Sequence, residues 1–425
     1  MYKNSVYKIF TASLLITSYL QYSLRSYISV VPLLFSLLLL VISEVVKPSK
    51  MSLGKWLTFL MWVPYSALAT IYYLNHPYLG MILHPVLITN ILLPFIIFAL
   101  LRIKQIYSIK AFGKFVFNTC YLFLICQLVV CVGQLSTYIL GIGLPVSPDY
   151  SEFYMVTGTL TNSNDVACLT LFGAFCVSKT EKFVMQKYKV LIVWITIILI
   201  LLIVQSRSAI VMTLVVFMFS REIENGKKIS QTVGMSMLLL FIIPLMYFGD
   251  NNSALGLMIN RLESLVTIYN NGINSDQSIN VRSESYVYFL GQLDKINLGS
   301  GKIYDYLEFS TQANFDSSLM FHNPHSLIVE LGYWMGWPGL ITFFLPFITM
   351  VYIYQRNILF VILAIVSMHI SSSVLGSFYY FLFLMMSILV SNSKQLEGKR
   401  IEYTPNNYSS PFLSTLQKPL NKYNI

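Results

Sequence analysis

The stretch YKVLIVWITIILILLIVQ, residues 188–205, contains one charged side chain in eighteen positions. An α-helix needs roughly 20 apolar residues to cross ~30 Å of hydrocarbon, so this stretch predicts a membrane-spanning helix. A second apolar run begins at residue 208. The short polar segment QSRSA, residues 205–209, is therefore expected to form a tight connection between two spans.

The remainder of the chain continues this pattern. Its 425 residues are 56% hydrophobic and 11% charged, with a mean hydropathy of +0.66, whereas roughly a quarter of the residues in soluble domains are charged. The composition predicts an all-α, polytopic integral membrane protein. We expect about twelve spans, near residues 7–24, 27–46, 55–74, 81–101, 115–139, 165–178, 188–205, 208–220, 231–248, 333–354, 357–371 and 374–391.

The distribution of Lys and Arg predicts the orientation of these spans, because cytoplasmic loops are enriched in both residues. With the N-terminus inside, all but six of the 28 Lys and Arg residues fall on the cytoplasmic side. The six on the other side are Arg25, Arg207, Arg261, Arg282, Lys295 and Lys302. Both termini are therefore expected in the cytoplasm. Because the basic residues are scattered over short loops, the net charge of +10 does not indicate nucleic-acid binding.

This topology divides the chain into four parts. Residues 1–248 would hold spans one to nine, 249–324 one long extracytoplasmic loop with short helices, 325–391 spans ten to twelve, and 392–425 a cytoplasmic tail. A connection as long as 249–324 is usually functional or disordered. Lys3 and Lys8 precede the first apolar run, as in a signal peptide, but no small-x-small cleavage site follows. We expect this run to remain as the first span.

The sequence does not predict a metal or a cofactor. The five cysteines lie in apolar runs at no metal-ligand spacing, which favours small core residues. The predicted outer loops contain no DxD pair, and no close Cys, Asp or third His accompanies His322 and His325.

Three outer arginines are candidates for binding an anion. Arg207 lies at membrane level, where a cation costs up to roughly 3 kcal/mol unless a partner or water satisfies it. A guanidinium matches phosphate in a planar, bidentate geometry, so Arg207, Arg261 and Arg282 could together hold a lipid diphosphate. Two alternatives remain: ion pairs with Glu263, Glu284 or Asp165, and anchoring to phosphates of the membrane lipid.

Seven aromatic residues accompany this predicted outer face. They could stack on sugar rings, but amphipathic aromatics also form belts at membrane interfaces, and the belt is the favoured interpretation. The seven are Tyr286, Tyr288, Tyr304, Tyr306, Tyr333, Trp334 and Trp337.

Five segments follow one another along the chain: GTLTNSNDVA at 158–167, QSRSA at 205–209, RSESY and LGSGK in the long loop, and HNPHSLIVELGYWMGWPGL at 322–340. In order, spacing and predicted outer location they resemble the O-antigen ligase and polysaccharide polymerase family of bacterial envelopes, over roughly residues 155–345. The resemblance implies a mostly helical, metal-independent, inverting glycosyltransferase of the cytoplasmic membrane. It also implies undecaprenyl-diphosphate-linked oligosaccharide as substrate, and leaves room for other polysaccharide assembly proteins as partners.

The resemblance assigns roles to individual residues. Arg207 and Arg282 match arginines that contact the diphosphate, and His322 matches the histidine ahead of the Gly-x-x-x-Gly turn, here Gly332 and Gly336. The spacing from His322 to Gly332 is one residue short of the family pattern, so His325 is the alternative base. Asn162 and Asn164 match an asparagine-rich turn in the middle loop, although the arginine expected ahead of it is absent.

Chemistry argued without the family leads to the same expectation. Transfer of a glycan from a diphosphate lipid to a hydroxyl needs a base and a cationic site for the departing diphosphate. We expect a polymerase of lipid-linked repeat units, with His322 or His325 as base and with Arg207, Arg282, Arg261 and Asn164 as substrate-binding residues. A ligase of the same family and a lipid-linked oligosaccharide flippase or other transporter are the alternatives, followed by a membrane partner without activity.

Overall fold

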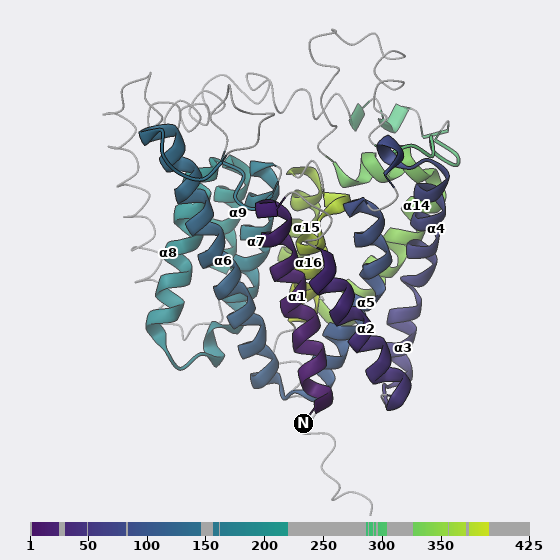
Figure 1. The fold of residues 1–425 in the computed structure, drawn as a ribbon, viewed down its shortest axis with the longest axis horizontal. Coiled ribbons are helices and arrows are strands. Elements are labelled where there is room, and N and C mark those ends of the chain that lie inside the picture. The colour runs from purple at the N-terminus through teal and green to yellow at the C-terminus, as the bar shows by residue number, and fades with distance from the viewer. Residues whose placement is uncertain are drawn as a thin grey trace, which may run out of the picture. The chain divides into compact units, whose positions relative to one another are not determined.

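The computed structural model is mostly helical over the residues that it describes. These are residues 2–24, 30–48, 50–81, 84–145, 156–160, 162–219, 286–287, 289–291, 293–294, 296–303, 326–355, 357–370 and 374–390. Twelve α-helices and no β-strand occur within these ranges (Figure 1). The all-α prediction is therefore confirmed for this part of the chain.

The helices are α1 (Tyr2–Leu24), α2 (Val31–Val46), α3 (Leu53–Leu60), α4 (Val63–Asn75), α5 (Pro85–Ile106), α6 (Ile109–Leu140), α7 (Ser163–Thr180), α8 (Lys187–Val204), α9 (Arg207–Phe219), α14 (Leu327–Met350), α15 (Ile358–Ile370) and α16 (Phe378–Leu389). Short turns of helix extend the set: η2 (Tyr78–Gly80), η4 (Glu181–Phe183), η6 (Val351–Gln355) and η7 (Val374–Gly376). Eleven of the twelve predicted ranges coincide with these helices, and the twelfth, 231–248, lies outside the described residues.

Within the described residues, five helical segments are long and apolar enough to cross a membrane. They are Leu53–Asn75, Pro85–Ile106, Ile109–Leu140, Lys187–Val204 and Leu327–Gln355. The first combines α3 and α4, which a turn at 61–62 separates. Large apolar side chains also face outward from shorter helices, as Val31, Phe35 and Leu38 do from α2. These surfaces are compatible with insertion into lipid.

Two predicted boundaries were wrong by six residues. The range 115–139 is in fact a helix that begins at Ile109, because the side chain of Ser108 accepts a hydrogen bond from the backbone N–H of Ala111 at 3.2 Å. The range 333–354 begins at Leu327, after the cap Ser326. Glu330 looks like a loop residue in the sequence, yet an acidic side chain in the first turn of a helix is favourable.

Apart from α3 and α4, which continue one another, neighbouring helices of the described parts mostly run in alternating directions, so helix ends gather at two levels (Figure 1). We call the level at which α1 begins the proximal end and the opposite level the distal end. The distal end holds the starts of α5, α7, α9, α14 and α16 and the C-terminus of α15. The described parts of the segments 158–167, 205–209, 298–302 and 322–340 therefore lie at, or begin at, the distal end.

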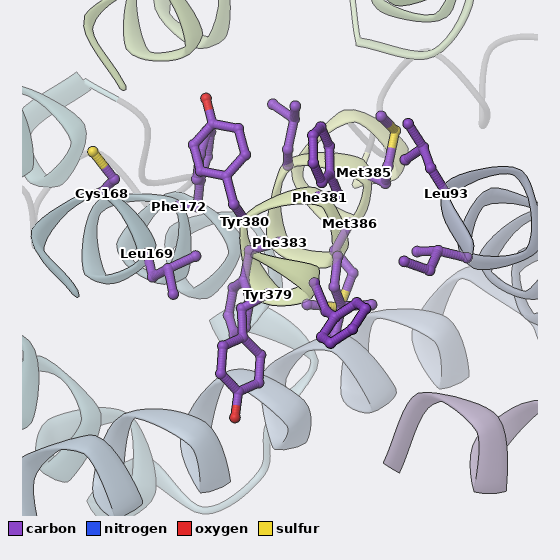
Figure 2. Packing of buried hydrophobic residues seen from close by; sticks show 14 of the residues in the cluster. Leu93, Cys168, Leu169, Phe172, Tyr379, Tyr380, Phe381, Phe383, Met385 and Met386 are labelled. Atoms are coloured by element: carbon purple, nitrogen blue, oxygen red, sulfur yellow. The ribbon is translucent and has the colours of Figure 1, made fainter. Parts of the chain in front are cut away.

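Helix α16 lies at the centre of the bundle. All twelve of its residues are buried, and it packs against α1, α5 and α7. Figure 2 shows its aromatic side chains pointing to opposite sides, with Tyr380 beside Phe172. The ring of Phe383 lies 4.7 Å from that of Phe123 on α6, and the Tyr379 hydroxyl donates to the carbonyl of Leu15 at 2.8 Å.

At the proximal end of α16, polar side chains donate hydrogen bonds to its last carbonyls. Lys104 Nζ donates to the carbonyl of Leu389 at 2.6 Å, and Gln355 Nε2 donates to that of Ser387 at 2.5 Å. The last carbonyls of a helix lack partners within the helix, and a buried one would be costly without a donor. These two side chains therefore allow α16 to end inside the protein.

The central position of α16 predicts that Phe383→Ala lowers the stability of the purified protein in detergent. We expect a loss of ~2 kcal/mol, less than the about 3–5 kcal/mol of a soluble core, because packing rather than removal from water holds membrane helices together. Thermal unfolding measures it. Leu122→Ala, on the outward face of α6, is the control and should leave the midpoint unchanged. Equal shifts in both variants would contradict a central role for α16.

Candidate functional site

The connection between α6 and α7, which we call the middle loop, is bonded to α6 at residues 157–159 by two buried glutamines. Gln134 Oε1 accepts the backbone N–H groups of Thr157 at 3.0 Å and Gly158 at 2.8 Å, and its Nε2 donates to the carbonyl of Gly158 at 3.1 Å. About two turns earlier on α6, Gln127 Oε1 accepts the N–H of Thr159 at 3.0 Å, and Gln127 Nε2 donates to the hydroxyl of the same residue. Residues seven apart lie on the same helix face, so Gln127 and Gln134 form one polar surface on α6. We call this pair the docking strip. It holds 156–160 against the bundle.

This docked segment leads directly into α7. Asn162 caps the helix, with its side-chain oxygen accepting the N–H of Asn164 at 2.8 Å. Ser163 and Asp165 are buried, and Asn164 is partly exposed. The predicted site residue Asn164 thus lies in the first turn of α7 at the distal end, with its backbone positioned by Asn162.

Helix α14 is broken at Gly336. The backbone there has φ 60° and ψ −152°, which is not helical, so the end of one half-helix meets the start of another. Such a break frees carbonyls on one side and N–H groups on the other. In a membrane-embedded protein each freed group needs a partner from the protein or from water.

The LGSG part of the long loop supplies those partners. The backbone N–H of Ser300 donates to the carbonyl of Tyr333 at 2.6 Å, and that of Gly301 to the carbonyl of Trp334 at 3.0 Å. In return, the N–H of Trp337 donates to the carbonyl of Asn297 at 3.0 Å. Residues 296–301 therefore supply hydrogen-bond partners for backbone groups freed at the break in α14.

Glycine is required on both sides of this junction. Gly299 has φ +73°, and a Cβ there would lie 2.6 Å from the N of Gly336 and from the carbonyl oxygen of Trp334. At Gly336, with φ +60°, a Cβ would lie 2.5 Å from the N of Gly299. Two backbones can approach this closely only where neither carries a side chain. We call these contacts, between residues 296–301 and 333–337, the glycine junction.

Further contacts hold the long loop at the distal end. The hydroxyl of Tyr72 on α4 donates to the carbonyl of Leu298 at 2.8 Å. Tyr286 shares a hydrogen bond with Ser326, the cap of α14, and stacks on His369 with ring centroids 4.7 Å apart. Phe289 packs edge-on against Tyr333 at 5.2 Å. The described parts of 286–303 thus connect α4, α14 and α15.

The favoured interpretation of the aromatic residues as an interfacial belt is wrong for two of them. Tyr333 and Trp334 are buried, and their backbone carbonyls belong to the glycine junction. Trp337 is 42% exposed and donates its indole N–H to the carbonyl of Leu293 at 3.1 Å. These residues join the loop to the bundle.

The predicted site residues are only partly within the described structure. His322, His325, Arg261 and Arg282 lie outside the described residues. The backbone of Arg207 begins α9 at the distal end, while its side chain is outside the described part. Among the described positions, the QSRSA turn, the α7 cap and the glycine junction all occur at the distal end.

Sequence reasoning missed several residues at this end. Gln127 and Gln134 looked like isolated polar residues in an apolar run, and only their spacing of seven hinted at a shared face. Gln205, Asp165 and Glu330 are all buried at the distal end. The first was counted as the last residue of a span, Asp165 was considered only as an alternative ion-pair partner of the arginines, and Glu330 was given no role.

The chain matches no known protein family, and no characterised protein is similar enough in sequence to count as a relative. The arrangement at the distal end must therefore carry the functional argument.

The glycine junction predicts that Gly336→Ala is destabilising. A methyl group there would force a strained φ and push residues 297–299 away, so we expect a loss of about 1–3 kcal/mol. Thermal unfolding in detergent measures it. Gly291→Ala is the matched control, because a Cβ at Gly291 meets nothing within 4 Å. If both variants unfold at the parent temperature, the junction does not constrain α14.

The docking strip predicts that Gln134→Leu releases the middle loop. The variant would leave the N–H groups of Thr157 and Gly158 without an acceptor, at a cost of roughly 1–3 kcal/mol each if they stayed buried. Hydrogen–deuterium exchange of residues 156–160 should therefore accelerate. Ser136→Ala, on the exposed side of α6, should leave that exchange unchanged. Unaltered exchange in Gln134→Leu would show that the glutamine does not hold the loop.

Proposed function

We propose that this chain is a membrane-embedded polymerase that joins undecaprenyl-diphosphate-linked oligosaccharide repeat units into a capsular, exopolysaccharide or O-antigen chain. The glycine junction carries the proposal. It joins LGSGK to GYWMG, two of the segments on which the resemblance to the O-antigen ligase and polysaccharide polymerase family rests. The other two described segments, GTLTNSN and QSRSA, lie at the same end of the bundle.

The proposal includes a topology. Twelve spans with both termini in the cytoplasm place the distal end, and with it the long loop 249–324, outside the cytoplasmic membrane. Lipid-linked repeat units would then meet the enzyme with their glycans in the extracytoplasmic space and their undecaprenyl chains in the bilayer.

In the proposed reaction, a hydroxyl at the non-reducing end of an incoming unit attacks the anomeric carbon of the growing chain. The new glycosidic bond forms as the bond from that carbon to the diphosphate oxygen breaks, with inversion of configuration. His322, with His325 as the alternative, takes the hydroxyl proton. Arg207 and Arg282, assisted by Arg261, bind the departing undecaprenyl diphosphate, and Asn164 contributes a polar group beside it. No metal or cofactor takes part.

The distribution of charge favours an enzyme over a carrier. In all twelve described helices, each charged residue lies in the first or last two turns. Asp165 and Glu330 are in the first turns of α7 and α14, and Lys104 and Lys179 are in last turns. Transporters place polar and charged groups near the bilayer midplane, where the substrate crosses.

Polymerisation of a purified lipid-linked repeat unit by the protein in liposomes tests the proposal. We expect a ladder of lengthened products that persists in a metal chelator. His322→Ala and Arg282→Ala should lower the rate by about 10²–10⁴-fold, since each removes one role from the transition state. Lys302→Ala, an exposed cation in the same loop, is the control and should retain the parent rate.

Three other outcomes would contradict all or part of the proposal. Transfer of the glycan only to a different acceptor would identify a ligase. Movement of the lipid-linked glycan across the bilayer without chain growth would identify a carrier. A ladder that survives loss of both His322 and Arg282 would preserve the activity but refute the assigned residues.

A further inference from the structure

Gln205 is a buried side chain whose amide bonds nothing in the protein. It ends α8, is 5% exposed, and neither its Nε2 nor its Oε1 has a hydrogen-bond partner. The other buried glutamines among the described residues behave differently. Gln127, Gln134 and Gln355 each bond at least one backbone group. The buried amide at 205 therefore lacks the docking role that these three have.

The backbone at Gln205 is also unfavourable for this residue type. Its φ of 62° and ψ of 29° are left-handed, a conformation that glycine adopts without cost and that other residues rarely adopt. The fold holds it there, since its backbone N–H donates to the carbonyl of Leu201 at 2.9 Å. Glycine at this position would remove both the strained φ and the buried unpaired amide. Stability alone does not account for a glutamine here, and such exceptions concentrate at functional sites.

The position of Gln205 places it in the proposed active site. It precedes Ser206, which is also buried, and Arg207, which begins α9. Helix α7 packs beside both α8 and α9, so its buried first turn is adjacent to this connection. Helix α9 also packs against α15, which ends beside the Tyr286–His369 stack. The α8–α9 turn thus belongs to the same distal surface.

The donor and acceptor atoms of the amide restrict which ligand groups can satisfy it. A phosphate oxygen can only accept, so it would satisfy Nε2 and leave Oε1 without a partner. A sugar hydroxyl both donates and accepts, and two neighbouring hydroxyls satisfy the whole amide. We propose that Gln205 binds hydroxyl groups of the sugar attached to the diphosphate, next to the arginine that binds the diphosphate itself. This inference rests on the proposed function and adds a residue that selects for the sugar.

The test compares two lipids bound by the purified protein. One is undecaprenyl diphosphate, and the other is the same lipid carrying the repeat unit of the polymerisation assay. For Gln205→Gly we expect unchanged or higher thermal stability, unchanged affinity for the bare lipid, and about tenfold weaker binding of the glycosylated lipid, equivalent to two neutral hydrogen bonds. Gln205→Asn, which tolerates a left-handed backbone but has a shorter amide, should show the same selective loss.

Gln186→Leu is the matched control, an exposed glutamine at the other end of α8, and should bind both lipids as the parent does. Equal weakening of both lipids in Gln205→Gly would mean that the residue shapes the diphosphate site, and unchanged binding of both would mean that water satisfies the amide; either result overturns the inference. Failure of the parent protein to bind either lipid would instead refute the proposed function.

Discussion

The hydrogen bonds across the break in α14 are the constraint on which the distal end depends. The break frees backbone groups among the buried residues 333–336, and a buried backbone group is costly without a partner. Ser300, Gly301 and Asn297 provide those partners from a segment more than thirty residues earlier. The break and the loop therefore stabilise each other, because neither has satisfied backbone groups without the other. Once they are joined, the loop is fixed against α4, α14 and α15.

Backbone groups of the middle loop also need hydrogen-bond partners, and there side chains of α6 supply them instead of a second backbone segment. Gln127 and Gln134 have long, flexible side chains that end in an amide, so each can donate to and accept from a chain segment lying across α6. In a low-dielectric interior such fully bonded amides fix a segment in one position. The described parts of the middle loop and of the long loop are thus held in place in two different ways. Both hold irregular backbone at the end of an apolar helical bundle.

The sequence predicted the helices well and the junctions poorly, for physical reasons. Apolar runs of membrane length have few alternatives to helix, so the ranges along α1 to α9 agree with the structure to within a few residues at most boundaries. The boundary of α14 was missed because burial of Glu330 is a tertiary property. Gly332 and Gly336 were recognised as a turn, but small residues four apart are equally typical of close helix packing. Only the arrangement of Gly299 against Gly336 reveals that a loop backbone fills the space.

Gln205 shows the limit of sequence reasoning most clearly, since its φ and its burial are invisible in QSRSA. In the sequence this glutamine looks like the last residue of a span, next to a short turn where water would satisfy it. In the structure it is enclosed and held left-handed. Two other irregular segments in the described part of the distal end have partners: the α14 break is bonded by the LGSG segment, and residues 157–159 by the α6 glutamines. The α8–α9 turn differs in carrying a buried, unbonded side-chain amide able to bond a polyhydroxylated ligand. That exception lies one residue from Ser206 and two from Arg207, where a diphosphate-linked sugar would have to lie if the arginine binds the diphosphate.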